Sequence, residues 1–251
     1  RDSPYPVIGL AGMAWIFLWL GMTSSGDFLP KPHDSGDHPN GTPTGGELPF
    51  FRREILLRLL ALAVVVISIN GIWQFYRAWM PKMLEEQHGY SPHQVRWFTA
   101  SYFISTDLGC LFAGFLARRL SLPLGNHTAR VVVYGGCCAL CALGTVASSQ
   151  SAGLPLLLIL LVVGFGALGL FPIYYSLTQE LSARHQGKVT GALNFFGWVT
   201  TAQMQQIVGR HVDETKSHAD GLFWISLAPV AGLIALVALW PPRKKLPIQG
   251  D

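Results

Sequence analysis

The sequence predicts an all-α membrane protein with seven transmembrane helices. Half of its 251 residues are hydrophobic and 13% are charged, which is about half the charged share of a typical soluble domain. The chain also contains seven separate stretches that approach the ~20 mainly apolar residues needed for a membrane-crossing helix. These observations exclude a disordered chain, a nucleic-acid-binding domain and an ordinary cytosolic enzyme.

The first, fourth, fifth and seventh stretches are plainly apolar, whereas the other three are more polar. The greater polarity indicates helices that face a protein interior or a water-filled path. Residues 24–49 are rich in Gly, Pro, Asp and His and predict a flexible loop between the first two helices. The other connections are short, so the last six helices are expected to form one compact bundle. The seven stretches are residues 5–23, 55–80, 97–117, 130–149, 153–178, 188–209 and 221–240.

Lysine and arginine are unevenly divided between the two ends of this predicted bundle. Twelve of the 18 fall in one set of alternate connections and five in the other, while Arg77 lies within a helix. Cytoplasmic loops are enriched in these residues. The pattern predicts an N-terminus outside the cell and a cytoplasmic C-terminus, in a multi-pass protein of the plasma (inner) membrane. The net charge of +4 then reflects orientation and indicates no nucleic-acid partner.

The second stretch carries the first group of candidate site residues. Asn70, Trp73, Gln74 and Arg77 are spaced i, i+3, i+4 and i+7, which places them on one helical face. A charge at the membrane centre costs at least ~2.5–3.5 kcal/mol, so such residues are functional candidates. The guanidinium of Arg77 either pairs with an anionic substrate group or extends to the outer interface beside an aromatic belt.

The third and sixth stretches carry the remaining candidates. Asp107 either carries a coupling proton or forms a structural or gating pair with Arg118 or Arg119, and we favour the pair. Asn194 and Trp198 share a face of the sixth stretch. They either contact a ligand or take part in interhelical contacts, in which a hydrogen bond contributes about 0.6–2 kcal/mol.

Two motifs are misleading in this context. Residues 164–169 match GxGxxG, but the match lies inside an apolar helix, where close helix packing explains the glycines better than nucleotide binding does. Cys138 and Cys141 form a CxxC pair without a second pair of ligands. All eight histidines fall in loops or near helix ends. The sequence thus predicts no catalytic residues and no metal site.

Several segments also resemble a known family, and they occur in its order. Together they are similar to the seventh, eighth, tenth and eleventh helices of the major facilitator superfamily, and most of all to its anion:cation symporters, which include hexuronate and other sugar-acid carriers. The segments are Trp73–Leu84, His88–Ser91, Asp107–Gly109, Gly114–Leu120, Phe171–Pro172, Gly187–Gly197 and Ile207–Gly209.

The resemblance implies a transporter whose seven helices here correspond to helices 6–12 of a twelve-helix fold. Residues 1–24 would then hold the last helix of the N-terminal half, 25–52 the cytoplasmic linker, 53–242 the C-terminal six-helix bundle and 243–251 the cytoplasmic tail. The missing N-terminal half would complete the protein. Asn194, with Asn70, Trp73 and Gln74, would line the central cavity.

The function expected from this resemblance is secondary transport of a small organic anion across the lipid bilayer. A proton or sodium gradient would drive it by alternating access, without a cofactor. The alternative is a seven-helix receptor-type membrane protein without transport activity. A retinal protein is disfavoured because residues 222–240 contain no lysine, and an enzyme because no histidine or carboxylate pair lies at membrane depth.

Overall fold

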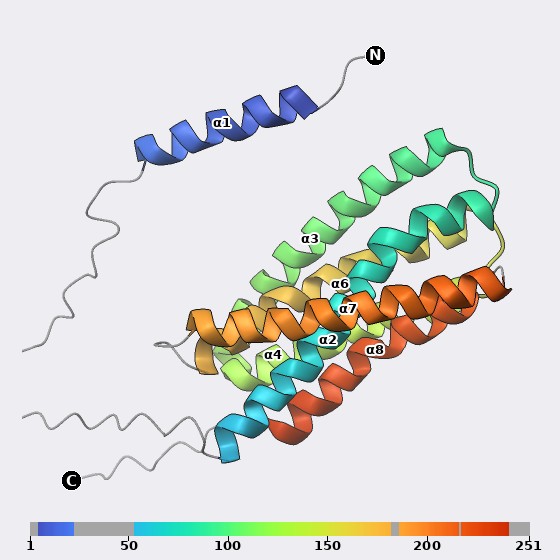
Figure 1. Cartoon of the computed structure of the whole chain (residues 1–251). Coiled ribbons are helices and arrows are strands. Elements are labelled where there is room, and N and C mark those ends of the chain that lie inside the picture. The colour runs from blue at the N-terminus through green and yellow to red at the C-terminus, as the bar shows by residue number, and fades with distance from the viewer. Residues whose placement is uncertain (1–4, 23–52, 182–185, 216, 241–251) are drawn as a thin grey trace, which may run out of the picture. The chain divides into compact units, whose positions relative to one another are not determined.

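The computed structural model describes residues 5–22, 53–181, 186–215 and 217–240. The chain divides into two compact units, Arg1–Leu48 and Pro49–Asp251. The described part of the first unit is one apolar helix, α1 (Tyr5–Met22). The second unit is a bundle whose described residues form the following helices, α2 (Arg53–Glu86), α3 (Pro92–Leu124), α4 (Asn126–Ala142), α5 (Gly144–Ala147), α6 (Leu154–Leu181), α7 (Gln186–Thr215) and α8 (Ala219–Leu239) (Figure 1).

The all-helical prediction is confirmed, and each of the seven apolar stretches overlaps a helix among the described residues. Among the described residues, five helical segments are long and apolar enough to cross a membrane. They comprise α2, α3, α4 together with the one-turn helix α5, α6 and α8. The predicted linker and cytoplasmic tail, together with residues 182–185, lie outside the described residues.

Several helices are longer than their apolar stretches because polar residues form their ends. α3 begins at Pro92 and not near residue 97, since Ser91 and Gln94 form a capping box. Ser91 Oγ accepts a hydrogen bond from the Gln94 backbone N–H at 3.3 Å, and Gln94 Oε1 accepts one from the Ser91 N–H at 2.9 Å. α3 and α4 are joined at Gly125, whose φ of +78° favours glycine.

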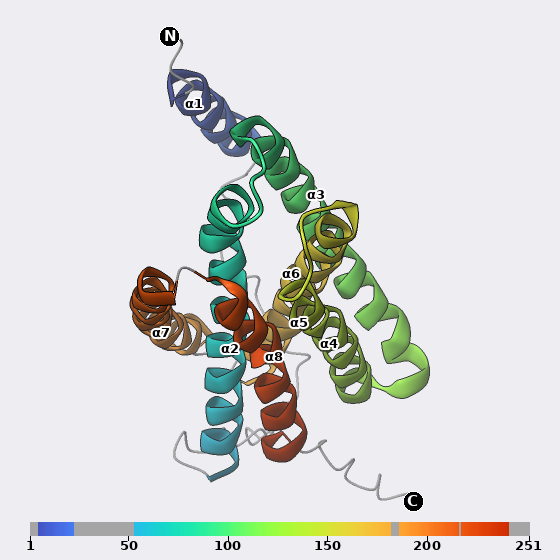
Figure 2. The same cartoon turned by 90° about the vertical axis from the view of Figure 1, so that its right-hand side faces the viewer.

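Within the Pro49–Asp251 unit, α2 is the central helix and packs against α8, α7, α6 and, over a shorter length, α3. Figure 2 shows α7 on one side of α2 and the α3, α4 and α6 group on the other. Two contacts fix α8 antiparallel to α2. Tyr76 and Ser226 share a hydrogen bond of 3.0 Å in the buried interior, and the Arg58 guanidinium lies 5.1 Å from the centre of the Trp240 ring.

The contact between α3 and α6 is unusually close because glycines lie where the helices cross. A Cβ atom on Gly109 of α3 would lie 2.0 Å from the carbonyl oxygen of Phe165. A Cβ on Gly164 of α6 would lie 2.5 Å from the ring of Tyr102, and one on Gly169 would lie 3.3 Å from the Gly109 carbonyl oxygen of α3 and 2.9 Å from Cys137 Sγ of α4. The glycines of the GxGxxG match therefore serve helix packing, as the sequence indicates.

Candidate functional site

The first group of candidate residues lies where α2 meets α7. Asn70 of α2 is half-buried and faces Gly197 of α7, since a Cβ at Gly197 would lie 3.1 Å from Asn70 Nδ2. Asn70 Nδ2 donates to the carbonyl of Val66 within its own helix at 2.9 Å. Within the described part of the chain, the Asn70 side-chain oxygen has no protein donor. It is therefore available to accept a hydrogen bond from a ligand.

Further along α2, Gln74 and Trp79 are linked to α7 through Gln205. Gln205 Nε2 donates to the backbone carbonyl of Gln74 at 3.4 Å, and Gln205 Oε1 accepts a hydrogen bond from the Trp79 indole N–H. The Gln74 side chain itself is buried. We call Asn70, Gln74 and Gln205 the α2–α7 polar seam. Gln205 is absent from the predicted site residues, and the only signal for it in the sequence is a group of glutamines in the polar sixth stretch.

Trp73 points away from this seam. Its ring makes edge-to-face contacts with Phe103 of α3, at a centroid distance of 6.0 Å, and with Phe171 of α6, at 6.4 Å. The four candidates that helical spacing places on one face of α2 therefore do not all contact the same neighbouring helix. Asn70 faces α7, whereas Trp73 faces α3 and α6.

Arg77 follows Trp73 by one helical turn and has an exposed side chain. Among the described residues it forms neither an ion pair nor a side-chain hydrogen bond. Arg77 lies in the candidate membrane span Ile55–Glu86, and an unpaired cation at membrane depth is costly. Pro81, four residues later in the same helix, has no N–H to donate to the Arg77 carbonyl. Arg77 thus offers an unpaired guanidinium beside a locally weakened helix.

The candidate residues on α7 differ in how far their side chains are exposed. Asn194 is half-buried, Trp198 is 59% exposed, and Thr201, one turn beyond Trp198, is buried. Gly197 and Thr201 are buried, whereas Trp198, about 100° round the helix from Gly197, is exposed. Asn194 follows the same side as Gly197, so it lies one turn from Asn70 along the seam. Trp198 is available to a ligand or to another part of the protein.

The charged candidates on α3 are not brought together. Asp107 and Arg118 are 11 positions apart on one helix, a rise of ~16 Å, and both are exposed. Within the described residues, Asp107 pairs with neither Arg118 nor Arg119. The ion pair at this end instead joins Arg130 of α4 to Glu180 of α6, with side chains 18% and 30% exposed. Sequence reasoning missed this pair, because only the fold brings the start of α4 beside the end of α6.

The described chain also contains no group of three or more His, Cys, Asp or Glu side chains able to hold a metal ion. Its candidate site residues are instead amides, aromatic rings and an arginine, Arg77, that forms no ion pair among the described residues. Comparison with known families gives a clear result, since residues 3–202 match the Major Facilitator Superfamily. The chain belongs to this family.

Membership of the Major Facilitator Superfamily places this chain among multi-pass membrane transporters that carry small molecules. The family is non-enzymatic, which confirms that the chain is not an enzyme. The receptor alternative is set aside for the same reason. No curated protein matches the chain, so the family match is the basis on which function is assigned.

Proposed function

We propose that this Major Facilitator Superfamily protein is a secondary active transporter of an organic anion, such as a hexuronate or another sugar acid. Transport would be coupled to a proton gradient, with sodium as the alternative coupling ion, and would proceed by alternating access. The single observation that carries the anion assignment is the exposed, unpaired guanidinium of Arg77 within a membrane-spanning helix. A guanidinium binds carboxylates through two parallel hydrogen bonds.

The proposed substrate site consists of Asn70, Trp73, Gln74, Arg77, Asn194 and Trp198. Arg77 would pair with the substrate carboxylate, and the free amide oxygen of Asn70 would accept a hydrogen bond from a hydroxyl group. The aromatic rings would pack against the apolar face of the sugar ring. Transporters of this kind bind substrate near the bilayer midplane, between their two halves, so residues of the other half would complete the site.

We further propose that α1 is the sixth helix of a twelve-helix transporter and that α2 to α8 are helices seven to twelve, with α4 and α5 counted as one. The lysine and arginine pattern supports a cytoplasmic position for the Arg130–Glu180 end of the bundle. The Lys82 end would then face away from the cytoplasm. Asp107, Arg118 and Arg119 would act separately, as structural or gating charges along α3.

The test is uptake by the full-length protein in proteoliposomes, with hexuronates, aldonates and neutral sugars compared with and without a pH gradient. Uptake of hexuronate that rises with an inward proton gradient is the expected result. Replacing Arg77→Gln should weaken apparent affinity about 10- to 100-fold, because hydrogen bonds to charged groups contribute about 1.5–3 kcal/mol.

The matched control is Arg96→Gln, which removes an exposed arginine from the start of α3, outside the proposed site. It should leave affinity unchanged. Uptake of neutral sugars alone would contradict the anion assignment. Equal effects of the two substitutions would show that Arg77 does not bind the substrate. This result would not contradict the proposal that the protein is a transporter.

A further inference from the structure

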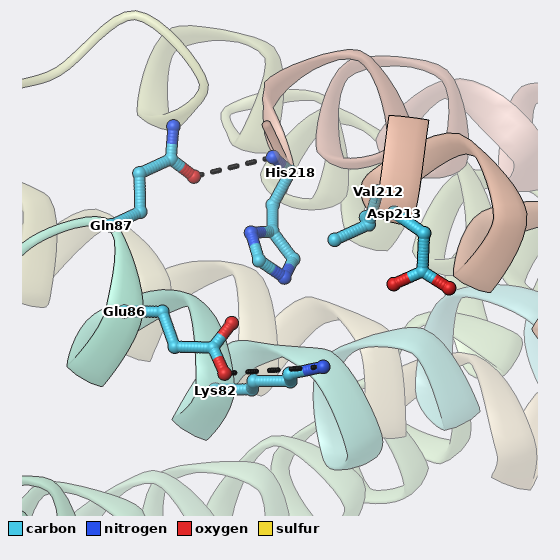
Figure 3. A pocket seen from close by; sticks show the side chains of 6 residues that line it. All are labelled: Lys82, Glu86, Gln87, Val212, Asp213 and His218. Carbon is cyan, nitrogen blue, oxygen red and sulfur yellow. Dashed lines mark hydrogen bonds and ion pairs between the residues drawn. The ribbon is translucent and has the colours of Figure 1, made fainter. Parts of the chain in front are cut away.

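A polar cavity of about 370 Å³ lies at the Lys82 end of the bundle, away from the proposed substrate site. It is formed where the end of α2 meets the end of α7 and the start of α8. Figure 3 shows the His218 ring pointing into this space, with Gln87 and Glu86 on one side, Asp213 on the other and Lys82 across from it. The lining residues are Lys82, Glu86, Gln87, Val212, Asp213 and His218.

His218 is the unusual member of this group. It is 2% exposed, yet neither of its ring nitrogens has a hydrogen-bond partner among the described residues. Its backbone N–H donates to Gln87 Oε1 at 3.3 Å, and its ring lies 5.8 Å from that of Trp79. His218 therefore holds the turn between α7 and α8 against the end of α2.

A positive charge on this ring would alter the contacts that hold it. His218 occupies the N-cap position of α8, where the helix dipole disfavours a cation. The Lys82 ammonium, itself 5.3 Å from the centre of the Trp79 ring, would repel it. The Glu86 carboxylate of α2 would attract the charged ring, but burial outweighs this attraction, so the imidazolium is more stable in water than in the closed junction.

We propose that His218 is a proton-binding switch that releases the α7–α8 turn from the end of α2 when it becomes charged. The neutral ring keeps the turn closed against Trp79. The imidazolium, which has no hydrogen-bond partner among the described residues of the closed junction, moves into water and opens the junction. This proposal concerns conformation alone and does not depend on the identity of the substrate.

The direction of the pH effect follows from burial, which lowers the pKa of His218 below its usual value of 6.5. The unfolded or opened form binds the proton more readily than the closed form does. The closed junction is thus fully stable above pH 6.5, and it loses stability as the pH falls below this value towards the lower pKa of the closed form.

Other ionisable groups face the same junction and must be distinguished from His218. His88 follows α2, and burial lowers its pKa as well. His211 of α7 contacts Asp220 of α8 at 3.2 Å, on an exposed surface. Lys216 lies outside the described residues.

Backbone hydrogen exchange of the full-length protein in lipid nanodiscs tests the proposal. At pH 5.5, residues 217–222 should exchange severalfold faster than at pH 7.5, after correction for the intrinsic pH dependence of exchange. His218→Gln, which stays neutral, should abolish this acid-dependent step. The matched control His93→Gln replaces an exposed histidine of α3 and should preserve it. Loss of the step in His88→Gln or His211→Gln, but not in His218→Gln, would overturn the proposal.

A second measurement covers the case in which His218→Gln does not fold. Exchange of the imidazole C2 hydrogen, followed by mass spectrometry, reports the protonation of each histidine in the wild-type protein. The His218 midpoint should lie below 6.5, the usual pKa of histidine. Glu86→Gln should lower the His218 midpoint further and Lys82→Gln should raise it, because the two side chains act on the ring with opposite signs. A His218 midpoint that neither substitution moves would contradict the switch.

Discussion

Where α3 crosses α6, glycine allows the backbones to touch, whereas α2 and α7 are joined through amide side chains. At the first interface a Cβ on Gly109 would lie 2.0 Å from a backbone oxygen. At the second, a Cβ on Gly197 would lie 3.1 Å from the end of the Asn70 side chain. A backbone oxygen within a helix cannot move aside, whereas a side-chain amide can rotate. The α3–α6 contact is therefore the rigid part of the bundle, and the α2–α7 seam is the adaptable part.

This difference matters for a transporter that alternates between two conformations. The seam carries the polar candidates for substrate contact, and its hydrogen bonds can be exchanged for others at modest cost. In membranes such interhelical bonds average about 0.6 kcal/mol. The close backbone contact between Gly109 of α3 and Phe165 of α6 involves no side-chain hydrogen bond that could be exchanged in this way. We therefore expect substrate-linked movement to be absorbed at α7 while α3 and α6 move as one piece.

The largest predicted effect is that of Gly109→Ala. The added methyl group overlaps the Phe165 carbonyl, so the helices must separate, and overpacking of this kind costs about 1–3 kcal/mol or more. We expect a large fall in thermal stability and in the yield of monodisperse protein, measured by size-exclusion chromatography in detergent.

The control for this prediction is Gly136→Ala in α4, where a Cβ meets no atom within 4 Å. It should leave stability unchanged or raise it slightly, because alanine favours the helix by about 1 kcal/mol. If Gly109→Ala and Gly136→Ala had the same stability, the conclusion that the α3–α6 contact is rigid would be wrong.

Much of this architecture could be predicted from the sequence, because the length and hydrophobicity of a stretch are enough to identify a membrane helix. All seven apolar stretches overlap helices among the described residues. The helix ends were less predictable, since α3 starts at a polar capping box that a hydrophobic window ignores. α2 continues past Pro81 to Glu86, well beyond its apolar stretch.

The candidate site was harder to predict. Helical spacing shows which residues share one face of a helix, but it does not show which other helix packs against that face. Asn70 and Trp73 are three positions apart, yet one faces α7 and the other contacts α3 and α6. The Arg130–Glu180 pair likewise depends on how two distant helices are placed. Such information lies in tertiary packing and has no local pattern.

An intermediate effect is predicted for Gln205→Leu, which removes both hydrogen bonds that Gln205 makes across the seam. The Trp79 indole N–H then loses its partner, so the cost should be about 1–2 kcal/mol. Thermal unfolding in nanodiscs measures this loss. Gln203→Leu is the control, since Gln203 is exposed and has no side-chain partner among the described residues. Equal stabilities of the two variants would show that the seam contributes little.

The smallest predicted effect comes from Gly197→Ala, the same substitution as Gly109→Ala but placed at the other interface. Here the new methyl group meets the Asn70 amide, which can move by a few tenths of an ångström without disturbing either backbone. Stability should change by less than about 1 kcal/mol, since the better helix propensity of alanine offsets the contact. The displaced Asn70 amide should nevertheless weaken substrate affinity in the uptake assay. A stability loss as large as that of Gly109→Ala would mean that α7 packs on α2 as rigidly as α3 packs on α6, and movement would then have to occur elsewhere.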